Sequence, residues 1–335
     1  MLPSFDLNVA DPVTTRYRRT HNTPVRETES RLNTMYGAWR TILCNSGMEA
    51  VNTAFDLIHP GSVIVDEETY FETRNYLQYR GEDVRLISSL GNLDELERVI
   101  RFGSLKTPVV ICGDSPSTFG HWLPVQKISS LAHRYGAYLM VDNSHVSLYY
   151  ENPIKDGSDI CIESYTKYVC GHGDAFAGGI ALAPSMQWLD DAVITGPANG
   201  LRSIDWILSR RGNVASPFAA YAVSRGLETL AVRMERHTES ARWIFNALRT
   251  HGVEALYSGC GGLITLPGRG EEFCSRLKRF ITIGTFGCTY SCTDFFRSDK
   301  AYSRGPCARL SVGLEDPQEL LADVMQAISE EEMEC

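Results

Sequence analysis

The sequence lacks the spacings that a metal site or a disulfide framework would need. Its ten cysteines include no CxxC pair, the closest being Cys288 and Cys292, and its eight histidines form no HxxxH motif. A chain of 335 residues can bury a large core without disulfide bonds. We therefore expect reduced thiols and no bound metal.

Long apolar runs and long charged runs are also missing. No stretch reaches the roughly 18 apolar residues that a membrane span requires, and residues 1–12 lack the basic and apolar regions of a signal peptide. The net charge is −9 and the pI is near 5.4. No run of like charges is longer than the three acidic residues 330–332. We expect a soluble, cytoplasmic protein that binds neither nucleic acid nor membrane.

The chain does contain a regular alternation of strand-like and helix-like segments. Apolar, β-branched runs predict buried strands at 62–66, 83–87, 108–114, 137–142, 159–164 and 178–183. Amphipathic stretches such as 93–103 and 124–136 separate several of them. This alternation predicts an α/β fold with a mainly parallel sheet that is covered on both faces.

The alternation of strand-like and helix-like segments ends at about residue 215. A long helix is expected over 221–252, followed by short strand-like pieces and a last helix over 316–331. We therefore expect three parts: an N-terminal segment (1–40), a large ligand-binding domain (41–215) and a smaller C-terminal domain (216–335).

Two strand ends offer an amine and a carboxylate. Lys167 follows the strand at 159–164, and Asp142 ends the strand at 137–142, so both are expected at the sheet edge where α/β proteins bind ligands. A desolvated amine can attack an aldehyde. Pyridoxal 5′-phosphate is such an aldehyde, and it also needs an acid to keep its ring nitrogen protonated. Lys167 and Asp142 fit these two needs.

A Ser-Gly step at the start of an expected helix adds a site for the phosphate. Ser46 and Gly47 precede a helix whose first N–H groups attract anions, and Ser164 and Thr166 would add hydroxyls. Taken singly, each feature is explained as well by a solvated turn residue or an ordinary helix cap. Jointly, one cofactor accounts for all of them.

Several stretches together resemble the Cys/Met-metabolism family of pyridoxal-phosphate enzymes, which includes cystathionine synthases and lyases and methionine lyases. The matching stretches are YRRTHNTP (17–24), SGMEA (46–50), TYFET (69–73), DSPS (114–117), VDNS (141–144), SYTKYVCGHGD (164–174), RGLETLAVRMERH (225–237) and ARLSVGLED (308–316). Their order and separation also agree with the family. The resemblance implies the aspartate aminotransferase-like fold type I, with a seven-stranded sheet domain and a smaller C-terminal α+β domain.

The resemblance assigns roles around the reacting atoms. It implies that Lys167 binds the cofactor and later moves protons, and that Asp142 pairs with the ring nitrogen. Tyr70 would stack on the ring and act as an acid or base, although a buried core tyrosine is the alternative. Arg309 would bind the substrate carboxylate through a two-pronged contact, with Thr285 close to that carboxylate.

The resemblance also implies the phosphate contacts and an oligomer. The phosphate-binding residues would be Ser46, Gly47, Met48, Ser164 and Thr166. Tyr17 and Arg19 resemble the pair that reaches the phosphate of a neighbouring subunit, which implies a homodimer at least. Only 16 residues precede Tyr17, fewer than the family usually has for an arm around a second dimer, so a homotetramer is left open.

Other positions depart from the family pattern. Thr118 occupies the position at which the family usually has an asparagine near the cofactor's phenolic oxygen, and Asp114 occupies the position of the usual glutamate. Glu72 stands for glycine or cysteine near the substrate side chain, where it would favour a cationic or hydrogen-bond-donating substrate unless it points to solvent. Tyr290 stands for a glutamate on the opposite wall.

Two further departures flank the lysine segment. Cys170 stands for a glycine, and Gly173 for a serine. The larger side chain at position 170 requires a backbone without positive φ.

These observations predict elimination or replacement at the γ or β carbon of an L-amino acid, in the manner of cystathionine γ-synthase and γ-lyase. An unusual substrate of specialised metabolism is consistent with the departures. The alternatives are a C–S β-lyase of the cystathionine β-lyase type, a transaminase, and a protein that binds pyridoxal phosphate without turnover.

Overall fold

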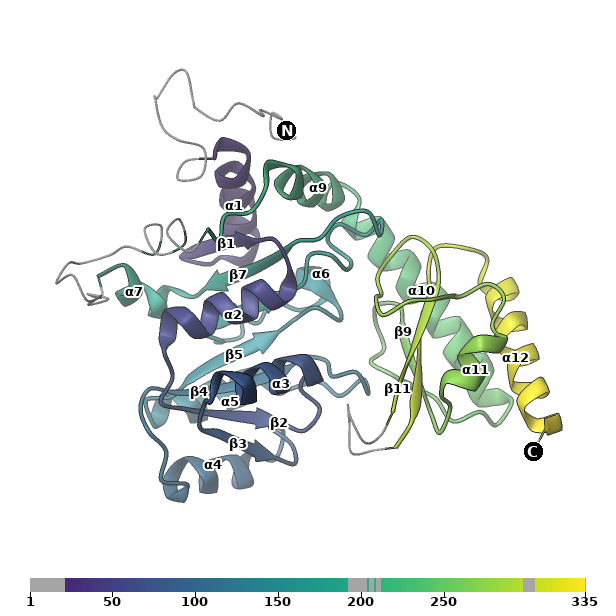
Figure 1. Cartoon of the computed structure of the whole chain (residues 1–335), viewed down its shortest axis with the longest axis horizontal. Coiled ribbons are helices and arrows are strands. Elements are labelled where there is room, and N and C mark those ends of the chain that lie inside the picture. The colour runs from purple at the N-terminus through teal and green to yellow at the C-terminus, as the bar shows by residue number, and fades with distance from the viewer. Residues whose placement is uncertain (1–21, 192–203, 205–207, 209–211, 298–304, 335) are drawn as a thin grey trace.

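Two sheets organise the chain, and each belongs to its own domain (Figure 1). The computed structural model describes residues 22–191, 204, 208, 212–297 and 305–334. The larger sheet has seven strands in the order β1-β7-β6-β5-β4-β2-β3. Its strands are β1 (Arg40–Cys44), β2 (Ser62–Asp66), β3 (Val84–Ile87), β4 (Val109–Asp114), β5 (Tyr138–Asp142), β6 (Ile160–Glu163) and β7 (Gly178–Leu182).

The large sheet is mainly parallel, as the alternation of segments predicted. Only β7 runs antiparallel to its neighbours β1 and β6. All six expected strands are present, and their ends agree with the sequence interpretation to within a residue. The seventh strand, β1, was not among them. Its five residues begin with the polar pair Arg40 and Thr41, so only three consecutive apolar residues remain, which is too short a run to indicate a buried strand.

Helices cover both faces of this sheet. Along β2, Val63 and Val65 point into a cluster with α2 (Gly47–Ile58), whereas Ile64 points into a cluster with α4 (Leu93–Phe102) and α5 (Val125–Arg134). This alternation is the two-residue period of a strand buried on both sides. The remaining helices are α1 (Thr23–Tyr36), α3 (Phe71–Arg80), α6 (Ser147–Tyr150), the 3₁₀ turn η1 (Pro184–Met186) and α7 (Trp188–Asp191).

The smaller domain is an antiparallel-rich sheet with helices packed on it. Its strand order is β10-β11-β12-β9-β8, formed by β8 (Leu256–Tyr257), β9 (Leu263–Pro267), β10 (Ile281–Thr282), β11 (Cys292–Phe296) and β12 (Cys307–Ser311). One apolar cluster joins this sheet to α10 (Leu230–Thr250), α11 (Glu271–Arg276) and α12 (Pro317–Glu334). The expected α+β character of this domain is thus present, while the expected domain limits at residues 40 and 215 stay predictions.

The prediction of a single long helix over 221–252 is wrong. The structure has two helices there, α9 (Pro217–Leu227) and α10, with a break at Glu228 and Thr229. At the break, the carbonyl of Gly226 accepts hydrogen bonds from both the backbone N–H of Thr229 (3.2 Å) and the Arg233 guanidinium (2.8 Å), so the arginine satisfies a carbonyl at the end of α9.

Arg233 also fixes the segment that follows Lys167. Its side chain is 4% exposed and donates to the carbonyl oxygens of Tyr168 (2.6 Å) and Val169 (3.3 Å). Gly171 makes room for the guanidinium: a Cβ there would lie 1.9 Å from Arg233 Nη1, and the backbone φ is +72°. A buried arginine on α10 thus positions the lysine loop of the large domain.

We predict that Gly171→Ala destabilises the protein far more than Gly252→Ala. Both glycines have φ near +75°, but no atom lies within 4 Å of a Cβ at Gly252. Left-handed strain alone costs about 1–2 kcal/mol, and displacing Arg233 should raise the cost at Gly171 to about 3 kcal/mol or more. Urea unfolding of both variants measures the difference, and equal losses would contradict the role given to Arg233.

Candidate active site

Lys167 lies at the carboxyl end of β6, in the turn that faces the small domain. Its Nζ donates a hydrogen bond to Thr285 Oγ1 (2.9 Å) and sits 4.6 Å from the centre of the Phe286 ring. Burial, followed by the charge of Arg309, lowers the pKa of Lys167 to about 8, against an opposing effect of Asp294. Near neutral pH, a larger fraction of this amine than of an ordinary lysine amine is therefore neutral and nucleophilic.

Asp142 ends β5 and lies next to Asp114 at the end of β4. The two residues are register partners in parallel strands. Burial raises the pKa of Asp142, while hydrogen bonds from the Ser144 hydroxyl (2.6 Å) and N–H (2.9 Å) and the charge of Lys167 act against the rise. Burial and the neighbouring Asp142 raise the pKa of Asp114 well above its usual range. The adjacent strand ends thus place two buried carboxyl groups side by side, and the charge of Lys167 favours ionisation of Asp142.

Tyr70 caps α3 and is held by Asp114. Its backbone N–H donates to Asp114 Oδ2 (3.0 Å), so the shorter acid at position 114 still reaches this segment. Burial raises the pKa of the Tyr70 phenol, and the charges of Arg309, Asp142 and Asp294 also act on it. Tyr70 therefore lies among the same charged groups as Lys167.

The start of α2 forms a cradle of backbone N–H groups against Ser164. A Cβ at Gly47 would lie 2.9 Å from Ser164 Oγ, so only glycine lets the helix come this close. Ser46 is the helix cap, with its hydroxyl accepting from the Glu49 N–H (3.1 Å), and Met48 packs against the core beneath. The helix N-terminus therefore provides the donors for an anion.

The hydroxyl of Thr166 serves the backbone of Ala177. It donates to the Ala177 carbonyl oxygen (3.0 Å) and accepts from the Ala177 N–H (3.0 Å). A hydroxyl has one proton to donate, so in this arrangement Thr166 has none left for a phosphate oxygen. The structure thus gives Thr166 a role in closing the lysine loop.

Arg309 on β12 lies between two aromatic rings. Its guanidinium carbon is 4.8 Å from the centre of Phe286 and 5.0 Å from that of Phe296. Asp294, the cross-strand partner on β11, accepts from Nε (3.0 Å) and Nη2 (2.6 Å). Sequence reasoning missed Asp294 and both phenylalanines, because their closeness to Arg309 depends on strand register; an acid within the apolar run of β11 was the one available signal.

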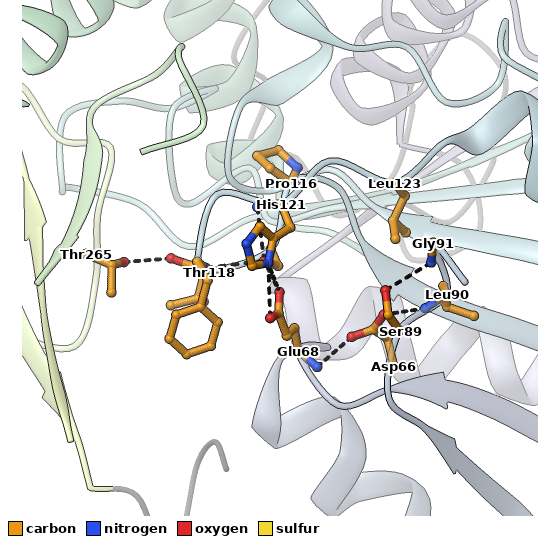
Figure 2. A network of polar contacts seen from close by, with 12 residues as sticks. Asp66, Glu68, Ser89, Leu90, Gly91, Pro116, Thr118, His121, Leu123 and Thr265 are labelled. Carbon is orange, nitrogen blue, oxygen red and sulfur yellow. Dashed lines mark hydrogen bonds and ion pairs between the residues drawn. The ribbon is translucent and has the colours of Figure 1, made fainter. Parts of the chain in front are cut away.

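The loop after β4 connects the site to both domains (Figure 2). On the large-domain side, Glu68 accepts from the Ser117 hydroxyl (2.6 Å) and contacts His121 Nδ1 (2.8 Å). On the small-domain side, Thr265 donates to the backbone carbonyl of Thr118 (2.6 Å). Thr118 is buried in this loop, so the residue that replaces the family asparagine lies at the domain junction.

His145, which sequence reasoning also missed, supports this loop from below. Its Nδ1–H donates to the Pro116 carbonyl (2.7 Å), and its ring lies 5.2 Å from that of Phe286. Burial, followed by the charge of Arg309, lowers the pKa of His145 to about 3. The imidazole is therefore neutral, and it helps to position the ring that contacts both Lys167 and Arg309.

Two departures from the family pattern touch each other. A Cβ at Gly173 would lie 2.3 Å from the Tyr290 hydroxyl, so the large side chain fits only because position 173 has none. Gly173 has a φ of +67°, whereas Cys170 is buried and is not among the residues with positive φ. Glu72 is exposed on the first turn of α3 in this chain.

The remaining expectations concern the oligomer, metals and membranes. Tyr17 and Arg19 lie outside the described residues. Among the residues that are described, no group of three or more histidine, cysteine, aspartate or glutamate side chains is arranged to hold a metal ion. No helix in that part of the chain combines the length and the apolar character needed to cross a membrane.

The residues at this sheet edge fit pyridoxal phosphate. The Gly47 cradle suits a phosphate, the buried Asp142 carboxylate suits a protonated ring nitrogen, and the partly neutral Lys167 amine suits an aldehyde. All three come from the large domain, while Arg309 and Thr285 come from the small one. The site is therefore built at the junction of the two domains.

Comparison with known proteins identifies the family. The family model described as "Cys/Met metabolism PLP-dependent enzyme" matches residues 6–260. The chain is 29% identical to L-methionine gamma-lyase of Pseudomonas putida over 93% of its own length and 84% of that protein. It is 26% identical to cystathionine gamma-lyase of Sus scrofa (93% and 83%) and to cystathionine gamma-synthase of Haemophilus influenzae (93% and 86%).

Solved structures share the fold. A cystathionine gamma-lyase from Micromonospora echinospora superposes with a TM-score of 0.83 at 22% identity, covering 98% of this chain and 93% of that one. The metB protein of Corynebacterium glutamicum gives a TM-score of 0.81 at 24% identity, with coverage of 98% and 91%.

We predict that capture of the cofactor by the apo-protein speeds up with pH and levels off above about 8, the pKa of Lys167. The neutral amine is the nucleophile, so the rate follows its fraction; an ordinary lysine would level off about two pH units higher. Stopped-flow absorbance after mixing with pyridoxal phosphate measures this. Lys167→Ala, the control, should give no lysine-bound absorbance band, and a profile that still rises steeply above pH 9 would contradict the lowered pKa.

Proposed function

The chain belongs to the Cys/Met metabolism family of PLP-dependent enzymes, and we propose that it eliminates or replaces a leaving group on the γ carbon of an L-amino acid, with the β carbon as the alternative position. The family membership and the cofactor follow from the comparisons. The reaction position and the substrate are the proposal.

One observation carries the proposal. The Phe286 ring lies 4.6 Å from the amine of Lys167 and 4.8 Å from the guanidinium of Arg309. An amine that exchanges protons and a cation that binds carboxylate therefore share one support. An α-amino acid has its carboxylate and its α proton on the same carbon, so this closeness suits it.

When bound, pyridoxal phosphate supplies an aldehyde for the substrate amine and an electron sink for charge at the α carbon. The protein's part is to bind and to move protons. Arg309 holds the carboxylate, and the Lys167 amine takes the proton from the α carbon. Thr285 orients that amine through its 2.9 Å contact. Asp142 would supply the carboxylate that pairs with the protonated ring nitrogen.

A leaving group on the γ carbon requires proton removal from the β carbon as well. We assign this step to Lys167 as well, and the donation of a proton to the departing group to Tyr70. The names of three relatives, methionine gamma-lyase, cystathionine gamma-lyase and cystathionine gamma-synthase, favour γ chemistry. The Tyr290–Gly173 contact changes one wall beside the lysine loop, which supports a substrate different from theirs.

The test is to incubate holoenzyme in D₂O with amino acids that carry a β or γ leaving group, and to follow the α proton by NMR. We expect exchange of the α proton and release of a 2-oxo acid and ammonia, or of a replacement product when a thiol is present. Lys167→Ala should lose exchange by at least about a thousandfold, since general base catalysis contributes about that much.

The same experiment separates the rival functions. Turnover that requires a 2-oxo acid acceptor, with cofactor recovered in the amine form, would indicate a transaminase. Bound cofactor without exchange of the α proton of any amino acid would indicate a protein that binds the cofactor but catalyses no reaction. Either result would overturn the proposal.

A further inference from the structure

The guanidinium of Arg309 already holds a carboxylate of the protein itself. Asp294 Oδ1 and Oδ2 accept from Nε and Nη2 at 3.0 and 2.6 Å, so the contact is two-pronged. This is the geometry in which arginine binds a free carboxylate. The Arg309 and Asp294 side chains are 5% and 14% exposed, so the pair is shielded from water.

Carboxylates and aromatic rings both contact the Arg309 guanidinium. Its central carbon lies over the Phe286 and Phe296 rings, 4.8 and 5.0 Å from their centres. Planar hydrogen bonds to carboxylates use the edges of the guanidinium. Asp294 takes the Nε and Nη2 edge. A substrate carboxylate must displace Asp294 or bind beside it, and in both cases it meets a like charge.

We propose that Asp294 is an internal competitor for the substrate carboxylate: it neutralises Arg309 while the site is empty of substrate and weakens the binding of any carboxylate that enters. The inference rests on the proposed function only in taking Arg309 as the carboxylate site. It makes Asp294 a specificity-determining residue that no comparison assigns.

Two physical arguments favour competition over a purely structural ion pair. A buried arginine without a counter-ion is costly, so a site that is often empty needs one. Asp294 is also close enough to the reacting groups for its charge to act on Lys167 and Tyr70.

The chemical class of ligand follows from this arrangement. An amino acid brings an ammonium group that offsets the charge of Asp294, whereas a 2-oxo acid product brings only its carboxylate. Asp294 should therefore weaken the hold on the oxo acid more than that on the amino acid, which favours product release.

The test compares the parent holoenzyme with Asp294→Asn, which keeps the shape and an acceptor oxygen but not the charge. Acetate is titrated and its dissociation constant is read from the absorbance of the lysine-bound cofactor. We expect the constant to fall by about threefold to tenfold, the effect of removing one nearby like charge. An unchanged or larger constant would overturn the proposal, because an orienting residue would weaken binding when removed.

Controls keep this result separate from other causes. Glu271→Gln removes an exposed partner of Arg297 in the same domain (2.6 Å) and should leave acetate binding unchanged. A second variant, Asp294→Ser, is unfolded by heat with and without acetate, so that binding can still be measured if Asp294→Asn is poorly stable. Acetate should raise the melting temperature of Asp294→Ser more than that of the parent. An equal rise would count against competition. Acetate binding needs no turnover, so failure here is distinguishable from failure of the proposed reaction.

A second readout concerns the lysine. The charge of Asp294 raises the pKa of Lys167, so in Asp294→Asn the pH midpoint of cofactor capture should fall below about 8. An unchanged midpoint would place Asp294 too far from the amine for the proposal.

Discussion

The buried guanidinium of Arg233 is the contact on which the geometry of the lysine loop depends. It comes from α10, and its Nη atoms donate to carbonyl oxygens at Tyr168, Val169 and Gly226, while its Nε donates to the Thr229 hydroxyl (3.0 Å). Burying a charge without a counter-ion is costly unless hydrogen bonds satisfy it, so the loop and the helix must keep this arrangement together. Lys167, one residue before the first of these acceptors, is held in place as a result.

The site beside this loop brings groups of opposite charge together in a largely buried environment. The charges of Arg309 and Asp294 act on Lys167, and the charge of Lys167 acts on Asp142. Burial favours the neutral form of each group. The amine is therefore easier to deprotonate, and the ion pair between Arg309 and Asp294 is retained. The same balance that activates the nucleophile also limits how strongly an anion can bind.

Much of the fold and part of the site could be predicted from the sequence, for physical reasons. Buried parallel strands are read as apolar runs, and ligands bind at their carboxyl ends, so Lys167 and Asp142 were found from position alone. Neither Asp294 nor His145 could be found in this way. Their roles depend on antiparallel register in the small domain and on a loop that packs across the junction, and neither leaves a periodic signal.

The departures from the family pattern gain meaning once their contacts are known. Gly173 and Tyr290 are 117 residues apart in the sequence, yet the phenol occupies the space where a side chain at 173 would begin. A side chain at 173 would require the Tyr290 phenol to move, so the two positions are coupled. The proposal of a different substrate rests on this coupling, because it lies beside the lysine loop and involves neither Lys167, Asp142 nor Arg309.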